Sequence, residues 1–421
     1  MCEKKQKISL VGIGMGTALT MTAQAEKAVR SADCLIGARR MLEAVRDLDA
    51  AAGKPALAEY RGEEILSYIR SHPEYREIAV LLSGDTGFHS GAKTLGSLLG
   101  SELPECEIQM IPGIASVVYL AARLNTSWED AALVSLHGKD EDFIRTVSRN
   151  RKTFLLLGGR DAGTRALERL REYEMDEIMI HAGRRLSYPD ERIVSGTIHQ
   201  ISETDVDGLC VVLAENPSPD LSACCHVPDD AFIRGNVPMT KAEVRAVSIA
   251  ELRLTKNAVV YDIGAGTGSV SVEAALSGTD IRVYAVEKNP EAVSLIGENR
   301  KKFRADGIRI ISGEAPEALE GLEAPTHVFI GGSSGNLKEI LKTVLDRSPE
   351  ARIVVNAISL ETVSEVMEAE KEGLLKDARI TQIMASRARK LGRYHLMTGQ
   401  NPVYIISAGG RSDAGCAFRE Y

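Results

Sequence analysis

The sequence contains no stretch that matches a membrane span or a cleavable leader. No run approaches the ~18 to 20 consecutive apolar residues that a helix needs to cross a bilayer. The first residues, MCEKKQKISLVG, pass directly from charge into an apolar strand, whereas a leader would place a longer apolar segment there. The sequence therefore predicts a cytoplasmic protein without a membrane partner.

Signatures of a disulfide framework and of a zinc site are also missing. The chain has seven cysteines, an odd number, and no C-x-x-C pair, which fits reduced thiols better than disulfides. Cys224, Cys225 and His226 lie together, but adjacent cysteines do not easily reach one tetrahedral ion, and no second ligand pair is spaced nearby. We therefore predict no metal site.

An excess of basic residues is absent as well. The formal net charge is −8 at pH 7, whereas a general nucleic-acid binder normally has a basic balance. We expect no nucleic-acid partner. The 421 residues, 44% of them hydrophobic, correspond to two or three domains of roughly 150 residues each.

The most informative stretch that is present runs from Val259 to Gly278, VVYDIGAGTGSVSVEAALSG. An apolar strand leads into glycines 264, 266 and 268, and Val270 and Ala274 then recur at helical spacing. Glycines allow a ligand to approach the backbone closely, and the first turn of a helix has free N–H groups. This stretch predicts a site for a ligand that carries a carboxylate or a phosphate.

Two ligand classes use such a turn, and its spacing separates them only in part. The dinucleotide fingerprint is G-x-G-x-x-G, but Ser269 occupies its final position. Glu287 ends the next strand, 19 residues after Gly268, where a carboxylate can accept hydrogen bonds from ribose hydroxyls. These features favour S-adenosylmethionine over a nicotinamide dinucleotide, and a purely structural turn is the third reading.

A second glycine turn opens the chain. A strand from Ile8 to Val11 precedes Gly12 and Gly14. Further on, the buried strand from Ile78 to Leu82 leads into a loop that contains Gly84 and Asp85. Ligands gather at the carboxyl ends of strands in open α/β sheets, so these residues are site candidates. For Asp85 alone, a helix cap or a turn is the simpler reading.

Two further candidates follow in the same half. Ser116 comes after a Pro112–Gly113 break, and can cap a helix or touch a ligand. His137 closes a later strand, where a lone histidine usually has a structural role. RIVSGT follows EIMIHAG after too few residues for a helical crossover, which predicts antiparallel strands in this region.

The prolines at 217, 219 and 228 mark a segment with little periodicity, which predicts a linker. We expect one domain over residues 1–215, with lobes of about 1–112 and 113–215, a linker over 216–232, and a second domain over 233–421. The second domain alternates helices and strands in a doubly wound pattern, and its last strands lack room for a crossover. The fold class is therefore α/β with an antiparallel C-terminal end.

Two polar segments of the second domain are candidates for ligand contacts. Thr240 and Glu243 have the spacing of a capping box for a helix that ends near Leu254. Between the last strands we expect a loop in which Arg387, Arg389, Lys390 and Arg393 have no acidic residue among them. Such a run is either a solvated face or a site for an anion, and guanidinium groups suit carboxylates.

These motifs resemble two enzyme families. Residues 1 to about 215 resemble the tetrapyrrole methylases, and residues from about 230 resemble the decarboxylating class I precorrin methyltransferases of cobalamin biosynthesis. The first resemblance is carried by VGIGMG, LLSGDTGFHSGA, IPGIASV and SLHGK, and the second by VPMTKAEVR, DIGAGTGS, AVEKNPEA, GEAPEAL, IGGSSGNL and NAISLE. Met15 departs from the first family, which commonly has proline there.

The resemblance implies a two-lobed tetrapyrrole methylase fold followed by a Rossmann-like domain, with one S-adenosylmethionine site in each. It implies methylation of a precorrin-6Y or cobalt-precorrin-6B type of macrocycle at carbons 5 and 15, with loss of the acetate carboxyl on carbon 12. The second domain would methylate carbon 15 and decarboxylate. The partner would be a corrin-ring molecule with several carboxylates, and the chain would form a homo-oligomer.

The resemblance also transfers roles to residues by motif. In the second domain the donor contacts would be Thr240, Gly264, Ala265, Gly266, Thr267, Gly268, Glu287, Glu314 and Ala315. In the first domain they would be Gly12, Gly14, Gly84, Asp85, Ser116 and His137. The macrocycle's carboxylates would meet Gly332, Ser333, Asn356, Arg387, Arg389, Lys390 and Arg393, and no catalytic acid or base stands out. A nicotinamide-dependent oxidoreductase and a non-enzymatic tetrapyrrole-binding protein are the alternatives.

Overall fold

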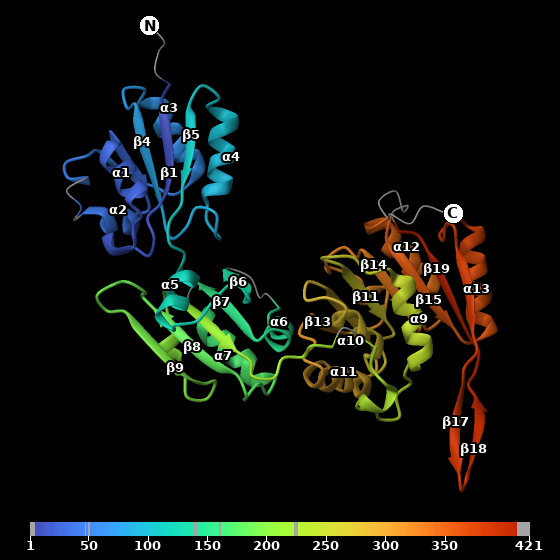
Figure 1. Cartoon of the computed structure of the whole chain (residues 1–421). Helices are drawn as coiled ribbons and strands as arrows, with labels where there is room; N and C mark the ends of the chain where they lie inside the picture. The colour runs from blue at the N-terminus through green and yellow to red at the C-terminus, as the bar shows by residue number, and fades with distance from the viewer. Residues whose placement is uncertain are drawn as a thin grey trace, which may run out of the picture. The chain divides into compact units, whose positions relative to one another are not determined.

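The computed structural model describes residues 5–46, 48, 51–137, 142–159, 161–222 and 226–410. It separates into two compact units (Figure 1). The N-terminal unit contains residues 1–141 and 150–218, and the C-terminal unit contains residues 142–149 and 219–421. None of the described helices is long and apolar enough to cross a membrane.

The first lobe of the N-terminal unit is a parallel sheet with strand order β3-β2-β4-β1-β5. Its strands β1 and β4 are almost fully buried, because both of their faces are covered by helices. The elements are β1 (Lys7–Gly12), α1 (Ala23–Ser31), β2 (Cys34–Gly37), α2 (Arg39–Arg46), β3 (Ala56–Ala58), α3 (Gly62–Ser71), β4 (Glu77–Leu82), α4 (Ala92–Glu102) and β5 (Glu107–Ile111).

The second lobe is a mixed sheet with strand order β6-β7-β10-β8-β9. Strands β8 and β9 are antiparallel, as the short connection between them predicts. The elements are α5 (Ser116–Arg123), β6 (Ala132–His137), β7 (Lys152–Gly158), α7 (Ala162–Glu172), β8 (Met179–Arg184), β9 (Arg192–Thr197), α8 (Glu203–Val206) and β10 (Cys210–Glu215).

The C-terminal unit contains a seven-stranded sheet with order β13-β12-β11-β14-β15-β19-β16. The first five are parallel, and β19 is antiparallel to both neighbours, so the predicted α/β class with an antiparallel end is confirmed. The strands of this sheet are β11 (Val259–Ile263), β12 (Arg282–Glu287), β13 (Ile308–Ser312), β14 (His327–Ile330), β15 (Arg352–Ala357), β16 (Arg379–Ile383) and β19 (Val403–Ala408). Strands β17 (Ser386–Leu391) and β18 (Tyr394–Gly399) form a separate two-stranded sheet.

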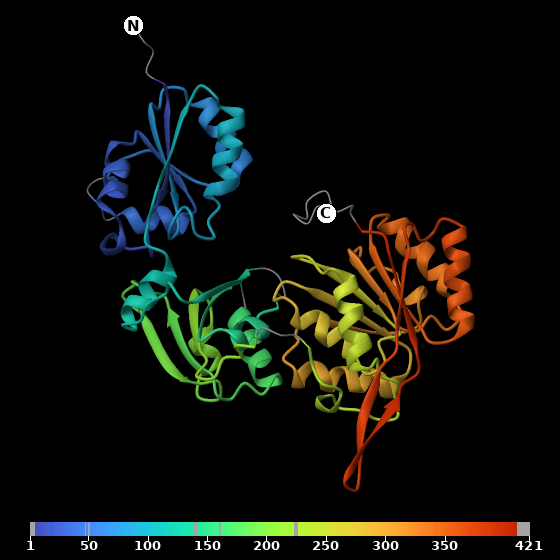
Figure 2. The same cartoon turned by 45° about the vertical axis from the view of Figure 1, so that its right-hand side comes forward.

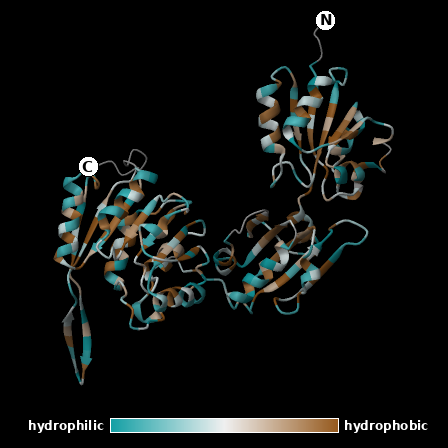
Figure 3. Cartoon of the chain, turned by 180° about the vertical axis from the view of Figure 1, so that it is seen from behind, coloured by the Kyte–Doolittle hydropathy of each residue, from teal (hydrophilic) through white to brown (hydrophobic). Residues whose placement is uncertain are grey.

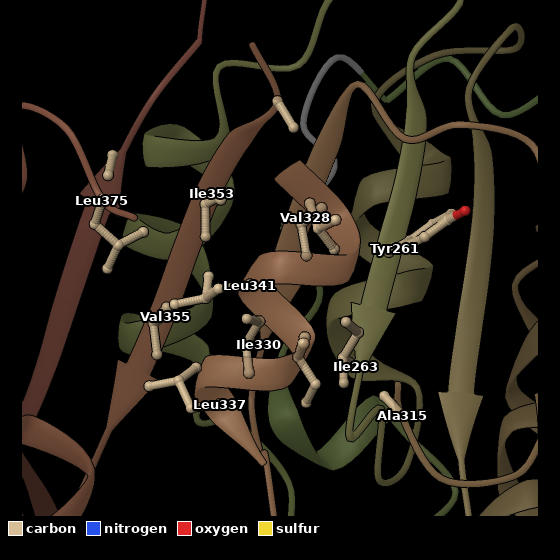
Figure 4. Close-up of a cluster of buried hydrophobic side chains, with 14 of the residues drawn as sticks. Tyr261, Ile263, Ala315, Val328, Ile330, Leu337, Leu341, Ile353, Val355 and Leu375 are labelled. Carbon is tan, nitrogen blue, oxygen red and sulfur yellow. The ribbon is translucent and has the colours of Figure 1, made fainter. Parts of the chain in front are cut away.

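Helices cover both faces of this sheet, because alternate strand residues point to opposite sides. Tyr261 and Ile263 of β11 pack with Leu337 and Leu341 of α12 (Figure 4). Val259 belongs to the same cluster, which also contains residues of α13, whereas Val260 packs with α10 and α11. Figures 1 and 2 show α9 and α13 on opposite sides of the strands. The helices are α9 (Ala242–Leu252), α10 (Ser269–Leu276), α11 (Pro290–Lys302), α12 (Leu337–Arg347) and α13 (Leu360–Lys371).

The hydropathy colouring agrees with this layered arrangement. The strands of the three large sheets are mostly hydrophobic, and the helices carry hydrophilic residues on their outer sides (Figure 3). This is the pattern expected when each helix buries one apolar stripe against a sheet.

One short helix joins the C-terminal unit although it lies earlier in the sequence. Helix α6 (Ile144–Arg149) begins where the Asp306 carboxylate accepts hydrogen bonds from the backbone N–H groups of Ile144 (2.7 Å) and Arg145 (3.0 Å). Arg145 also pairs with Asp220 at 2.9 Å. The sequence predicts that each domain is one continuous segment. In the structure α6 belongs to the C-terminal unit instead, because its partners Asp220 and Asp306 lie there.

The basic segment between the last strands was expected as a loop, and this expectation is wrong. Strands β17 and β18 pair in antiparallel register from Ser386–Gly399 to Leu391–Tyr394, and they extend away from the rest of the unit as a hairpin (Figure 1). The hairpin closes through Gly392, whose φ is +61°. A short turn with a left-handed glycine suits the twist of two paired strands.

Candidate functional site

A cavity of about 660 Å³ opens in the C-terminal unit, at the carboxyl ends of its parallel strands. In an α/β sheet this edge is the usual ligand site. The wall includes ten of the residues that the sequence predicts for this unit: Thr240, Gly264, Ala265, Gly266, Glu287, Glu314, Ala315, Gly332, Ser333 and Asn356. It also includes residues that the sequence analysis missed, among them Pro238, Met239, Lys241, Lys288, Ser334, Gln400 and Asn401.

The glycine turn needs glycines for backbone reasons. Gly264, Gly266 and Gly268 all have left-handed φ, of 71°, 58° and 76°. A Cβ on Gly264 would lie 2.6 Å from the carbonyl oxygen of Gly332, and one on Gly266 would lie 2.7 Å from that of Pro238. The turn is therefore enclosed by backbone, and its remaining open side faces the cavity.

The last two residues of the predicted turn do not line the cavity. Thr267 is fully buried, and a Cβ on Gly268 would meet Ile296 of α11 at 3.1 Å. Both residues attach the turn to the helix layer behind it. The part of the turn that lines the cavity is thus Gly264, Ala265 and Gly266.

The Glu287 carboxylate is held in place by three backbone N–H groups. Its Oε1 accepts hydrogen bonds from Lys288 (2.9 Å) and Asn289 (2.9 Å), and its Oε2 accepts one from Gly266 (2.8 Å). A carboxylate oxygen can accept two hydrogen bonds. Oε2 therefore has one acceptor position left at the cavity wall, which a ribose hydroxyl can use.

Asp262 precedes the turn and is fully buried. Its Oδ2 accepts a hydrogen bond from Ser271 (2.5 Å), while its Oδ1 has no hydrogen-bond partner among the described residues. Burial raises the pKa of Asp262 to about 6, because the charged form loses its hydration. Asp262 is not part of the cavity wall.

Asn356, near the end of β15, lines the cavity and carries a buried amide group without a partner among the described residues. Its Oδ1 accepts a hydrogen bond from Ser248 (3.1 Å), and its side chain is 9% exposed. No described group accepts from its Nδ2. A buried amide donor without a partner is costly unless a ligand uses it, so this wall fits a ligand with an acceptor such as a carboxylate.

Helix α9 starts differently from the sequence prediction, because the residue expected to complete the capping box is engaged in an ion pair. Lys241, not Thr240, is the N-cap residue, and no side chain caps the helix. The Glu243 carboxylate pairs with Arg387 through two hydrogen bonds of 2.6 and 2.7 Å, so it is not available for a capping box. These hydrogen bonds lower the pKa of Glu243.

Arg245 lies at the centre of a buried charge network and was not identified from the sequence. It is fully buried and donates to the Glu273 carboxylate (2.7 Å), to Asp229 (3.2 Å) and to the carbonyl oxygens of Thr240 (2.6 Å) and Val227. Because it binds the Thr240 carbonyl, it holds the segment that forms one wall of the cavity. A tertiary ion pair of this kind has no local sequence signal.

The four predicted cations of the hairpin are not brought to the cavity. Arg387 is engaged by Glu243 and by Asp229, the latter at 2.9 Å. Arg389 and Lys390 are exposed on β17, and Arg393 lies in the turn with its guanidinium over the Tyr394 ring. The hairpin therefore presents its remaining positive charge to solvent rather than to the glycine turn.

A second cavity, of about 230 Å³, lies between the two lobes of the N-terminal unit. Its wall includes the predicted residues Gly84, Asp85 and Ser116. The Asp85 carboxylate accepts hydrogen bonds from the backbone N–H groups of Gly87 (2.8 Å) and Gly113 (3.0 Å). Asp85 thus holds the loop after β4 against the start of the second lobe.

Gly12 and Gly14 pack behind this cavity rather than on its surface. A Cβ on Gly12 would lie 2.7 Å from the Gly84 carbonyl oxygen and 2.8 Å from the Gly113 nitrogen. Gly14 and Gly84 exchange two backbone hydrogen bonds of 3.2 and 2.7 Å. These glycines allow three loops to meet at close range.

Met15 follows in the same turn, where the resembled family commonly has proline. Its backbone N–H donates to the Thr20 hydroxyl at 3.0 Å, a hydrogen bond that proline cannot make. Its side chain lines the cavity. Methionine in place of proline therefore adds the hydrogen bond to Thr20, and the turn stays closed.

The predictions for His137 and for the Cys224–Cys225 pair concern residues that the structure describes only in part or not at all. His137 ends β6, and its side chain lies outside the described part of the chain. Cys224 and Cys225 also lie outside the described residues. Within the described ranges, no group of three or more histidine, cysteine, aspartate or glutamate side chains is arranged to hold a metal ion.

The comparisons with known proteins match both halves of the chain. Residues 230–408 match the family described as precorrin methyltransferase domain, and residues 7–202 match the tetrapyrrole (corrin/porphyrin) methylases. A relative from Pyrobaculum calidifontis, named probable cobalt-precorrin-6B C(15)-methyltransferase (decarboxylating), is 45% identical over 185 residues, which are 43% of this chain and 94% of the relative. The chain belongs to the decarboxylating precorrin methyltransferase family.

Another relative matches almost the whole length of this chain. It is a Sinorhizobium protein named precorrin-6Y C(5,15)-methyltransferase (decarboxylating), 26% identical over 412 residues, 95% of each chain. A crystal structure of a precorrin-6Y C5,15-methyltransferase from Geobacter metallireducens is 37% identical, with a TM-score of 0.42, over 44% of this chain and 96% of that one. The resemblance inferred from the motifs is confirmed, and this chain is an S-adenosylmethionine-dependent methyltransferase.

Proposed function

We propose that this chain methylates a precorrin-6Y or cobalt-precorrin-6B type of macrocycle at carbons 5 and 15, and removes the carboxyl group of the carbon-12 acetate. The proposal includes two donor sites, one in each unit. The similarity of the full chain to the Sinorhizobium relative supports it. The observation that carries it is the C-terminal cavity, which combines an open glycine turn with the free acceptor position of Glu287.

The residues of the C-terminal cavity fit S-adenosylmethionine by their chemistry. Gly264 to Gly266 would hold the methionine end, Glu287 the ribose, and the Glu314–Ala315 stretch the adenine edge. When bound, S-adenosylmethionine supplies an electrophilic methyl group. The protein's contribution is to hold the two reactants in line and to exclude water, because an electron-rich ring carbon needs no protein nucleophile.

The macrocycle would occupy the other part of the same cavity. Gly332 and Ser333 lie after β14 in the cavity wall, and the Nδ2 of Asn356, which is buried and unpaired among the described residues, would donate to a carboxylate that reaches it. Loss of carbon dioxide leaves electrons that the conjugated ring can accept, so orientation of the acetate is the main requirement. The hairpin cations, Arg387 to Arg393, do not line the cavity, so they are not assigned to the carboxylates nearest the donor.

The N-terminal unit would carry the second donor site and methylate carbon 5. The support is the cavity between its lobes, with Gly84, Asp85 and Ser116 in the wall. Gly12 and Gly14 would shape this site from behind. The two units would then act on different carbons of one substrate, each with its own donor.

The test uses purified full-length chain, S-adenosylmethionine and the reduced macrocycle, with and without cobalt. Mass spectrometry is expected to detect two added methyl groups and the loss of one carbon dioxide. A fragment of residues 226–421 is expected to add one methyl group and to decarboxylate, because the Pyrobaculum relative consists almost entirely of this half. A folded full-length chain that binds the donor but returns the macrocycle unchanged would refute the proposal.

A further inference from the structure

We propose that Arg40 binds a carboxylate in the cavity between the lobes of the N-terminal unit. No other arginine or lysine is present among the described residues that line this cavity. Arg40 is the second residue of α2, and α2 follows the carboxyl end of β2. It thus stands at the same edge of the sheet as Ser83, Gly84 and Asp85, which follow β4.

The Arg40 guanidinium is only partly satisfied. Its Nη1 donates to the Tyr188 hydroxyl (3.1 Å), and its Nη2 lies 3.4 Å from the Ser83 hydroxyl. Both partners are neutral. A guanidinium has five N–H donors, and within the described residues this half-buried cation donates only to two hydroxyls and pairs with no carboxylate. The geometry therefore provides a fork with free donors at the cavity wall.

The nearest acid in the cavity wall is already used. Both oxygens of the Asp85 carboxylate accept backbone N–H groups, from Gly87 and Gly113. Asp85 therefore holds its loop, and no ion pair joins it to Arg40 within the described part of the chain. An external carboxylate would supply the charge that Arg40 lacks.

A strained turn in the second lobe brings Tyr188 to Arg40. Arg185 and Ser187 are left-handed, with φ of 47° and 66°. Such backbone costs energy and persists where surrounding contacts enforce it. The Ser187 hydroxyl bonds Thr17 at 2.8 Å, and the Tyr188 hydroxyl is so close to Gly16 that a Cβ there would lie 2.2 Å away. The turn closes onto the first lobe and orients Arg40.

The ligand class follows from the donor geometry. Two parallel N–H groups of a guanidinium match the two oxygens of a carboxylate. If the proposed function holds, two sources are available, the methionine end of the donor and an acetate or propionate group of the macrocycle. The cavity of about 230 Å³ admits one edge of a macrocycle rather than the whole ring.

The test measures binding to the full-length chain by titration calorimetry, so it does not depend on turnover. The probes are S-adenosylhomocysteine, cobyrinic acid, which is a corrin with free carboxylates, and cobinamide, in which amides replace them. The variants are Arg40→Gln, Arg40→Lys, and Arg39→Gln as a matched control. Arg39 is the exposed neighbour of Arg40, and it does not line this cavity.

Arg40→Gln is expected to weaken one class of sites by about tenfold or more, which is the usual effect of losing a charge-assisted pair. Weaker binding of cobyrinic acid with cobinamide unaffected assigns the carboxylate to the macrocycle, and weaker binding of S-adenosylhomocysteine assigns it to the donor. Arg40→Lys should lose less, because it keeps the charge but not the fork.

Unchanged affinity of Arg40→Gln for both acidic probes, in a chain that melts like the Arg39→Gln control, overturns the inference. Failure of the proposed function gives a different result, in which the unaltered chain binds no corrin at all. An Arg40→Gln chain that does not fold leaves Arg40→Lys as the deciding variant. If Arg40→Lys then binds both acidic probes as tightly as the unaltered chain, the proposed paired binding of a carboxylate by the Arg40 guanidinium is overturned.

Discussion

The two glycine turns of this chain look alike in sequence and have different surroundings in the structure. The C-terminal turn presents Gly264 and Gly266 at the surface of its cavity. The N-terminal turn places Gly12 and Gly14 against the backbone of neighbouring loops, behind its cavity. A glycine-rich turn after a strand therefore predicts close approach of something to the backbone, and only the tertiary structure decides whether this is a ligand or another loop.

The difference has a physical origin in the two sheets. In the C-terminal unit, Gly264 and Ala265 donate to the Val286 carbonyl of the next strand, and the Glu287 side chain accepts the Gly266 N–H, so the turn is held by one strand end and a carboxylate. In the N-terminal unit, Gly84, in the loop after the neighbouring strand β4, forms a backbone bridge with Gly14, which closes the turn. The first arrangement leaves an open edge, and the second fills it.

The sharpest test of the comparison is Gly266→Arg. A large side chain would fill the C-terminal cavity, where even a Cβ lies 2.7 Å from the Pro238 oxygen. We expect the carbon-15 methylation to fall by about a thousandfold or more, a loss of roughly 4 kcal/mol or more in donor binding. Carbon-5 methylation in the same chain is the internal control, measured by mass spectrometry and NMR of the product. Loss of both activities in a folded chain would show that the two sites are not independent.

The buried acid beside the C-terminal turn gives the next largest effect. The pKa of Asp262 is raised to about 6, whereas it is about 3.9 in an unfolded chain. The folded state therefore holds the proton more tightly. The stability from this group is fully present below about pH 4 and is lost as the pH rises through about 6.

Asp262→Asn is expected to remove this dependence, which corresponds to about 2 kcal/mol between pH 4 and pH 7. Hydrogen exchange of peptides over β11 and α10, measured at both pH values, would report the opening free energy. Equal pH dependence in the variant and the unaltered chain would mean that Asp262 keeps an ordinary pKa in the fold.

Gly12→Ala tests the opposite side of the comparison. A Cβ would press on the backbone of Gly84 and Gly113 at 2.7 and 2.8 Å, and overpacking of this kind costs about 1–3 kcal/mol. We expect a lower thermal midpoint of the N-terminal unit. Gly91→Ala is the matched control, because its Cβ would meet open space. A Gly12→Ala chain as stable as the control, but with weakened donor binding, would mean that Gly12 contacts the ligand.

Glu287→Gln should have a smaller and specific effect on the C-terminal donor site. The amide keeps the shape of the carboxylate, but its NH₂ group cannot accept the backbone N–H groups that now bind one of the oxygens. We expect donor affinity to fall about tenfold, by calorimetry with S-adenosylhomocysteine. Glu298→Gln is the control, since Glu298 is exposed on α11 and does not line the cavity. An equal loss in both variants would remove the special role of Glu287.

The smallest effect is expected at the hairpin. Arg387 is 41% exposed, and its hydrogen bonds to Glu243 and its pairing with Asp229 raise its pKa. Arg387→Gln should lower stability by less than about 1 kcal/mol, because exposed ion pairs contribute little. Affinity for cobyrinic acid should be unchanged, as it should be in Arg393→Gln. A strong loss of corrin binding in Arg387→Gln alone would restore the sequence-based role of this residue.

The sequence was most informative where the signal is local. The DIGAGTGS turn with Glu287 at the end of the next strand indicated the C-terminal donor site, and the short connection between β8 and β9 indicated their antiparallel pairing. It was least informative about charged groups. Arg387 was expected at a ligand and instead pairs with Glu243 and Asp229, which are more than a hundred residues away in sequence.

The sequence by itself determined the class of the fold, the presence of two glycine turns and the family of the protein. Each depends on residue types at fixed spacing along one segment of chain. The tertiary structure decided which glycines face a cavity, which carboxylates are free to accept from a ligand, and that Arg40 and Arg245 matter at all. These properties depend on what lies across from a residue, and the partners come from distant strands and loops that no local pattern names.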